Sequence, residues 1–198
     1  MNRTGKAVIA IVLAAGVAAL AAGAAKRHDA PPPEFDANVT PLVDGDYLPA
    51  VRELLRGAKS SILCVMFLAQ PDDRHPDGPE SALLDDLIGA GKRGVAVTVI
   101  LDRTPERGES EDGKNRSAHD RLRAAGVPVF YDSPDRTTHS KVIVVDEEAV
   151  VIGSANWTYS ALKRNHEASV LIRSRDLAVH LKKRLLPIRS EAAEDDRK

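Results

Sequence analysis

One stretch, His139–Asn156, constrains the fold more than any other part of the chain. It contains two runs of apolar, mostly β-branched residues, Val142–Val145 and Val150–Ile152, which are separated by the polar segment 146–149. Two such runs around a short polar break are typical of a β-hairpin. The stretch therefore predicts two antiparallel strands joined by a tight turn.

The register of this hairpin decides which side chains meet. With the turn centred on the two adjacent glutamates of the break, Val145 lies opposite Val150 and Ile143 lies opposite Ile152. Side chains two residues apart on a strand share a face, and a slip of one residue would move them to the other face. This register places four polar side chains together at the open end of the hairpin: His139, Lys141, Ser154 and Asn156.

These side chains suit chemistry at phosphorus. Neutral imidazole is a nucleophile that titrates near physiological pH, so His139 can attack a phosphoryl group and form a covalent phosphohistidine. Lys141 and Asn156 can stabilise the negative charge on the phosphoryl oxygens by charge and by N–H donation. Gly153 allows close approach of a ligand or of another backbone segment.

Asp146 belongs to a different part of the hairpin. It lies five residues beyond Lys141, which corresponds to about 16 Å along an extended strand. We therefore expect Asp146 to be a turn or ion-pair residue and not a catalytic one.

The spacing of these residues resembles the signature of a known family. The pattern His139-x-Lys141-x4-Asp146-x6-Gly153-Ser154-x-Asn156 resembles the His-Lys-Asp signature of the phospholipase D superfamily at all six positions. Asn165 and Glu167 also resemble the family, whose glutamate at this place orients the nucleophilic histidine. The resemblance extends over roughly residues 46–172 and is strongest to the small, single-motif bacterial endonucleases. It implies an α/β fold, a mixed β-sheet flanked by helices on both faces.

The periodicity of the remaining chain predicts one domain built from alternating strands and helices. Strand, helix and strand in this order imply a parallel pair with a right-handed crossover, with Asp102 and Arg103 at the carboxyl rim. The polar loop 104–117 would lie over the site, and Trp157 is expected to pack in the core. The expected helices and strands are Tyr47–Gly57, Ser61–Leu68, Ser81–Arg93, Val95–Leu101, Ala118–Ala125, Pro128–Tyr131, Trp157–Lys163, Ala168–Ile172 and Arg175–Leu186.

The sequence of the N-terminal segment predicts that the chain is exported from the cytoplasm. Arg3 and Lys6 precede the apolar run Ala7–Ala25, which resembles a secretory signal with Ala22–Ala24 as a candidate cleavage site. The run is also long enough to be an uncleaved membrane anchor. In either case we expect a domain outside the cytoplasm, periplasmic, secreted or anchored. The expected organisation is a signal or anchor (1–25), a Pro-rich linker (26–45), a catalytic domain (46–188) and a charged tail (189–198).

Breaking a phosphodiester by this route requires a proton donor for the leaving oxygen as well as a nucleophile. His119 and His166 are candidate donors within the chain, but neither belongs to a motif. A two-fold homodimer is simpler, because it brings two copies of His139 together, and the resemblance implies the same arrangement for single-motif members. No metal or other cofactor is expected, since Lys141 supplies positive charge and no carboxylate cluster accompanies the motif.

The substrate class stays open between nucleic acid and phospholipid. The resemblance favours an endonuclease on DNA or RNA, but the net charge of −1 gives no basic footprint, and loss of Arg3 and Lys6 with a cleaved signal would lower it to −3. Membrane anchoring would favour a phospholipase D that releases head groups. A non-catalytic phosphate-binding module is a third alternative, which the intact His139, Lys141 and Asn156 disfavour.

Overall fold

The computed structural model describes residues 31–72, 75–103, 114–133 and 136–189. The chain divides into a short N-terminal unit, Met1–Glu34, and a compact unit that begins at Phe35. The expected signal or anchor and nearly all of the charged tail lie outside the described residues. None of the helices within the described ranges is long and apolar enough to cross a membrane.

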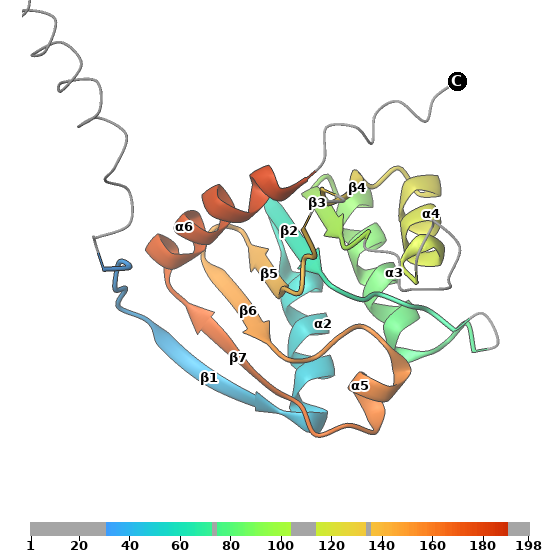
Figure 1. Cartoon of the computed structure of the whole chain (residues 1–198), viewed down its shortest axis with the longest axis horizontal. Helices are drawn as coiled ribbons and strands as arrows, with labels where there is room; N and C mark the ends of the chain where they lie inside the picture. The colour runs from blue at the N-terminus through green and yellow to red at the C-terminus, as the bar shows by residue number, and fades with distance from the viewer. Residues whose placement is uncertain (1–30, 73–74, 104–113, 134–135, 190–198) are drawn as a thin grey trace, which may run out of the picture. The chain divides into compact units, whose positions relative to one another are not determined.

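The compact unit is built on one mixed sheet of seven strands in the order β1-β7-β6-β5-β2-β3-β4 (Figure 1). β2 pairs in parallel with β3, and β3 with β4, whereas the other neighbouring pairs are antiparallel. The strands are β1 (Asn38–Val43), β2 (Ser61–Met66), β3 (Ala96–Leu101), β4 (Val129–Tyr131), β5 (Lys141–Val145), β6 (Ala149–Gly153) and β7 (Ala168–Arg173).

Helices cover both faces of this sheet, which confirms the predicted fold class. One apolar core joins odd-numbered residues of β5, such as Ile143, to α2, α3, α4 and α5. A second, smaller core joins even-numbered residues, such as Val142, to α6 on the opposite face. The helices are α2 (Tyr47–Gly57), α3 (Pro79–Lys92), α4 (Arg116–Ala124), α5 (Tyr159–Lys163) and α6 (Arg175–Leu185), with 3-10 turns at Asp44–Asp46 and Leu186–Ile188.

The limits set for the linker, the long loop and the tail need correction. Residues 38–43 of the predicted linker form the edge strand β1, which pairs with β7. Its side chains are mostly exposed and it contains Pro41, which only an edge strand tolerates well, so its sequence lacks the usual strand pattern. The predicted loop 104–117 ends early, because α4 begins at Arg116. Arg189, the first tail residue, pairs with Asp132 at the sheet edge.

The hairpin is present, but its predicted register is wrong by one residue. Val145 lies opposite Ala149, and Ile143 lies opposite Val151. The turn consists of residues 146–148, with positive φ angles at Asp146 and Glu147. Ala149, which was assigned to the turn, belongs to β6 instead. The parallel pairing of β2 with β3 is as predicted, and Trp157 is buried in the larger core, where its Nε1 donates to Tyr47.

Candidate active site

His139 and Lys141 lie together where the chain enters β5. The Lys141 Nζ is 3.3 Å from the His139 Nε2 and also donates to the His139 carbonyl oxygen at 3.0 Å. His139 is exposed, whereas Lys141 is only 8% exposed. The pair therefore presents an accessible imidazole above a lysine whose stem is packed in the protein.

Phe67, the first residue after β2, contacts both members of the pair. Its ring centroid is 4.5 Å from that of His139, and the Lys141 Nζ lies 4.8 Å from it in a cation–π contact. Sequence reasoning did not single out Phe67. The signal that would have found it is its position at the carboxyl end of a buried strand, where α/β sheets bind ligands.

The charge of Lys141 is influenced by two opposing effects. Burial lowers the pKa of its ammonium group below the ordinary value, and the negative charge of Glu167 partly offsets this by raising it. Glu167 thus acts electrostatically on the lysine of the pair.

Ser154, Asn165 and Glu167 form a second group of site residues. The Ser154 hydroxyl donates to one Glu167 carboxylate oxygen, and the Asn165 amide donates to the other at 3.1 Å. Within the described residues, no hydrogen bond joins Glu167 to His139. The structure therefore links Glu167 to the pair through charge, while the orientation of His139 by Glu167 that the resemblance implies stays a prediction.

The end of β6 positions two further site residues, Gly153 and Asn156. The Asn156 Oδ1 is buried and has no hydrogen-bond partner within the described part of the chain, so an acceptor is held unused next to two buried neighbours, Ala155 and Trp157. A Cβ atom at Gly153 would collide with the side chain and backbone of Ser169 on β7. The close approach that Gly153 allows is therefore to another strand.

The shifted register changes how these residues come together. Counting on from the observed pairs sets Lys141 opposite Gly153, so the predicted opposition of Lys141 to Ser154 and of His139 to Asn156 is wrong. β6 ends at Gly153, so Ser154 and Asn156 lie beyond the strand and outside its alternation of faces. Ser154 instead turns toward β7, where its amide donates to the Ala168 carbonyl.

Asp146 lies at the other end of β5, in the turn. Its carboxylate accepts hydrogen bonds from the backbone amides of Lys59, Ser60 and Ser61 and from the Ser60 hydroxyl. Burial raises the pKa of Asp146, but these hydrogen bonds outweigh it and hold the pKa below its usual value. Asp146 therefore ties the hairpin turn to the loop between α2 and β2.

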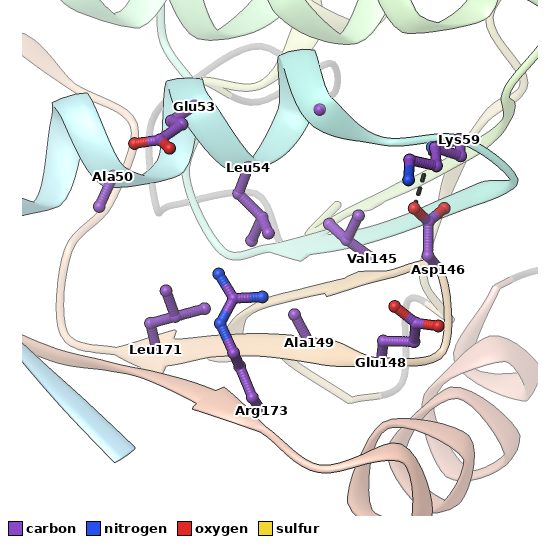
Figure 2. A pocket seen from close by; sticks show the side chains of 11 residues that line it. Ala50, Glu53, Leu54, Lys59, Val145, Asp146, Glu148, Ala149, Leu171 and Arg173 are labelled. Carbon is purple, nitrogen blue, oxygen red and sulfur yellow. Dashed lines mark hydrogen bonds between the residues drawn. The ribbon is translucent and has the colours of Figure 1, made fainter. Parts of the chain in front are cut away.

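A hollow of about 360 Å³ adjoins this turn (Figure 2). It is lined by acids and bases together, among them Glu53, Lys59, Asp146 and Arg173, and it contains no histidine. We do not assign phosphodiester chemistry to it, because it lacks a nucleophile and lies at the far end of β5 from His139.

The two alternative proton donors have other partners. His119 is 8% exposed and stacks on Tyr131 at 4.6 Å, and its Nδ1 lies 3.1 Å from Asp120. The His166 Nδ1 lies 3.1 Å from Asp44, at the end of β1. In the described part of the chain, no group of three or more His, Cys, Asp and Glu side chains is placed to hold a metal ion.

Comparison with known proteins supports the family resemblance. The family model described as "Cardiolipin synthase, PLD-like domain" matches residues 51–187. A phospholipase D of Rickettsia felis is 34% identical over 141 residues, which cover 65% of this chain and 68% of that protein. The mitochondrial cardiolipin hydrolase of Xenopus tropicalis is 32% identical over 127 residues, covering 64% of this chain and 53% of that protein. The matches thus span about half to two thirds of these relatives.

Solved structures give the same result. Nuc from Salmonella typhimurium, described as a phospholipase D family member, matches with a TM-score of 0.64 and 27% identity, covering 77% of this chain and 94% of that chain. NucT from Helicobacter pylori matches with a TM-score of 0.57 and 16% identity, covering 77% of this chain and 96% of that chain, which supports the fold alone.

Proposed function

The chain belongs to the phospholipase D superfamily of phosphodiesterases, and on this premise we propose that it is a metal-independent hydrolase working through a covalent phosphohistidine on His139. The observation that carries the proposal is the exposed His139 imidazole with the Lys141 ammonium 3.3 Å away. Lys141 supplies the positive charge that phosphoryl transfer needs, so no step requires a metal ion.

The reaction takes place in two displacements. The neutral His139 Nε2 attacks phosphorus while the bond from phosphorus to the leaving oxygen breaks, and a protonated group gives that oxygen its proton. When the substrate binds, Lys141 releases the Nε2 lone pair and donates to a phosphoryl oxygen instead, together with the amide of Asn156, so that the lone pair is free before the attack. Water next attacks the phosphohistidine, loses its proton to the group that acted as acid, and restores neutral His139.

We assign the proton donor to a second copy of the chain. Within the described residues, no hydrogen bond or ring contact joins His119 or His166 to the His139–Lys141 pair, and the partners of both histidines there are other residues. In a two-fold dimer the partner's His139, in its protonated form, would donate to the leaving oxygen. His139 is exposed, which leaves it accessible to such a partner.

For the substrate we propose nucleic acid. Two observations support this proposal. The sequence resembles the small bacterial endonucleases, and the structural match to Nuc covers 94% of the Nuc chain. A phosphodiester of DNA or RNA presents the scissile phosphorus on an exposed strand, and the exposed imidazole of His139 can reach it without a deep pocket.

Phospholipid is the second candidate. The relatives named phospholipase D and mitochondrial cardiolipin hydrolase favour it, and they are more similar in sequence than Nuc is. The proposed chemistry at phosphorus is the same for both substrates, so substrate assays must separate them.

The test is a parallel incubation of the purified chain with plasmid DNA, RNA, phosphatidylcholine vesicles and cardiolipin vesicles in EDTA, with His139→Asn as the control. The proposal predicts cleavage of a polynucleotide that persists in EDTA and is absent from the variant. Release of lipid head groups alone would establish the second candidate. Activity that disappears in EDTA and returns with magnesium would overturn the proposed mechanism.

We also propose that the chain is exported through its apolar N-terminal run. Cell fractionation, followed by N-terminal sequencing of the protein recovered from each fraction, tests this proposal. A mature chain that begins just after Ala24 indicates a cleaved signal, and an intact chain in the membrane fraction indicates an anchor. An intact chain in the soluble cytoplasmic fraction would contradict export.

A further inference from the structure

A buried amide next to the site connects the ends of two strands. Asn115, which immediately precedes α4, is 3% exposed. Its Oδ1 accepts from the Ala69 backbone amide at 2.7 Å, and its Nδ2 donates to the carbonyl oxygens of Phe67 and Asp102, each at 2.8 Å. One side chain thus ties the segment after β2 to the residue after β3.

The same strand ends hold the backbone on both sides of His139. The Asp102 Oδ1 accepts from the Thr138 amide at 2.7 Å, in a site where both residues are 6% exposed. The Phe67 amide donates to the Ser140 carbonyl at 2.8 Å. The residues immediately before and after His139 are therefore each fixed to a strand end that Asn115 also holds.

We propose that Asn115 and Asp102 are positioning residues for the catalytic pair, and we call the two side chains with their hydrogen bonds the Asn115–Asp102 clip. The clip acts through backbone atoms and through Phe67, whose ring contacts both His139 and Lys141. The inference rests on the proposed function of His139 as the nucleophile.

The alignment of the His139 imidazole with the substrate decides the rate of attack. Attack at phosphorus requires the imidazole nitrogen to lie in line with the leaving oxygen, and small misplacements of a reacting group reduce the rate strongly. His139 itself is exposed ahead of β5, and its backbone is fixed by the hydrogen bonds of its neighbours Thr138 and Ser140. Without the clip, the Thr138 amide and the Phe67 carbonyl lose these hydrogen bonds, and the imidazole becomes less well aligned.

Four variants test this, measured on the full chain with bis-p-nitrophenyl phosphate in EDTA, well below each melting temperature. Asn115→Ala and Asp102→Ala should lower kcat by roughly ten- to hundredfold with little change in KM. Asp102→Asn keeps an oxygen that accepts from Thr138 and should recover most of the rate. Asp86→Ala is the matched control, because Asp86 is 7% exposed and holds Arg52 and Arg56 in ion pairs between α2 and α3.

A second readout does not depend on turnover. The NMR chemical shifts of the His139 imidazole ring, assigned with His139→Asn, should change in Asn115→Ala because the ring moves relative to Phe67, and should stay unchanged in Asp86→Ala. If the chain hydrolyses no diester but this shift is found, the positioning role stands while the proposed function fails. Equal loss of melting temperature in Asn115→Ala and Asp86→Ala, with kcat and the chemical shifts of the His139 ring unchanged in both, would overturn the inference.

Discussion

At the scale of single residues, the central feature is an ammonium group beside a nucleophilic imidazole. The identities of His139 and Lys141 follow from the sequence, because a motif depends on residue type and spacing. Their 3.3 Å approach and their contacts with the Phe67 ring do not, since they depend on where β2 ends relative to β5. Asn115 was missed for the same reason, because its three partners come from segments 13 to 48 residues away in the chain.

The pH dependence of activity should respond to Glu167. Because Glu167 raises the pKa of Lys141 against the effect of burial, Glu167→Gln should lower that pKa further. Lys141 must be protonated to donate to the phosphoryl group, so activity is lost as pH rises through its pKa. A substrate whose leaving group needs no proton, such as bis-p-nitrophenyl phosphate, separates this effect from the proton donor, and with it we expect the alkaline limb of the kcat/KM profile to move to lower pH in Glu167→Gln.

Glu148→Gln provides the matched control for this profile, since Glu148 is an exposed carboxylate in the turn at the far end of β5. The alkaline limb of the kcat/KM profile of Glu148→Gln should coincide with that of the unmodified protein. An alkaline limb that stays in place, or moves to higher pH, in Glu167→Gln would contradict the electrostatic link between Glu167 and Lys141.

The buried thiol on β2 should be inert in the folded protein. Cys64 is fully buried, and burial raises its pKa to about 12, so almost no thiolate is present at pH 8. Iodoacetamide followed by mass spectrometry should detect very slow labelling in buffer and rapid labelling in denaturant. Fast labelling in buffer, at a rate independent of denaturant, would contradict the central position of β2.

At the scale of elements, the hairpin shows what sequence patterns can and cannot predict. The apolar runs identify β5 and β6 because strand residues alternate between two buried faces here. The register failed because turn length depends on backbone conformation, and positive φ angles at Asp146 and Glu147 permit a shorter turn than a polar tetrad suggests. β1 was missed because an exposed edge strand needs no apolar pattern.

Asp146 should matter for stability and not for catalysis. Asp146→Ala leaves three backbone amides without their acceptor, and we expect a loss of about 1–3 kcal/mol in the free energy of unfolding. Denaturant melts measure this, with kcat unchanged within about twofold. Glu148→Ala, which changes the exposed neighbour in the same turn, should have little effect on either quantity.

The pH dependence of this loss has a defined sign. The folded-state pKa of Asp146 is below its usual value of 3.8, so the carboxylate contributes its full stability above that value. The contribution is lost as pH falls through the folded-state pKa. The difference between the unmodified protein and Asp146→Ala should therefore shrink in acid, and a difference that grows there would contradict this assignment.

At the scale of the whole molecule, apolar periodicity predicted most of the strands and helices and their order, and the family resemblance implied a mixed sheet with helices on both faces. The sequence did not determine the substrate. A net charge of −1 describes the whole chain and does not say how charges are distributed around His139. A second subunit likewise leaves no pattern along one chain, and is inferred from the single nucleophile.

The proposed dimer makes a prediction for mixed subunits. A heterodimer of one unmodified chain and one His139→Asn chain, isolated through two different affinity tags, lacks either the nucleophile or the acid in its shared site. We expect it to be nearly inactive, while a doubly tagged unmodified dimer keeps full activity. A heterodimer with about half of that activity would indicate two independent sites and no shared one.

The most direct test of the whole account is the stereochemistry at phosphorus, measured with a phosphodiester made chiral by sulfur and isotopic oxygen. A covalent phosphohistidine requires two successive in-line displacements, first by His139 and then by water, and each inverts the configuration. The account predicts overall retention of configuration in the product. Overall inversion would mean that water attacks the substrate directly, and would contradict the role assigned to His139.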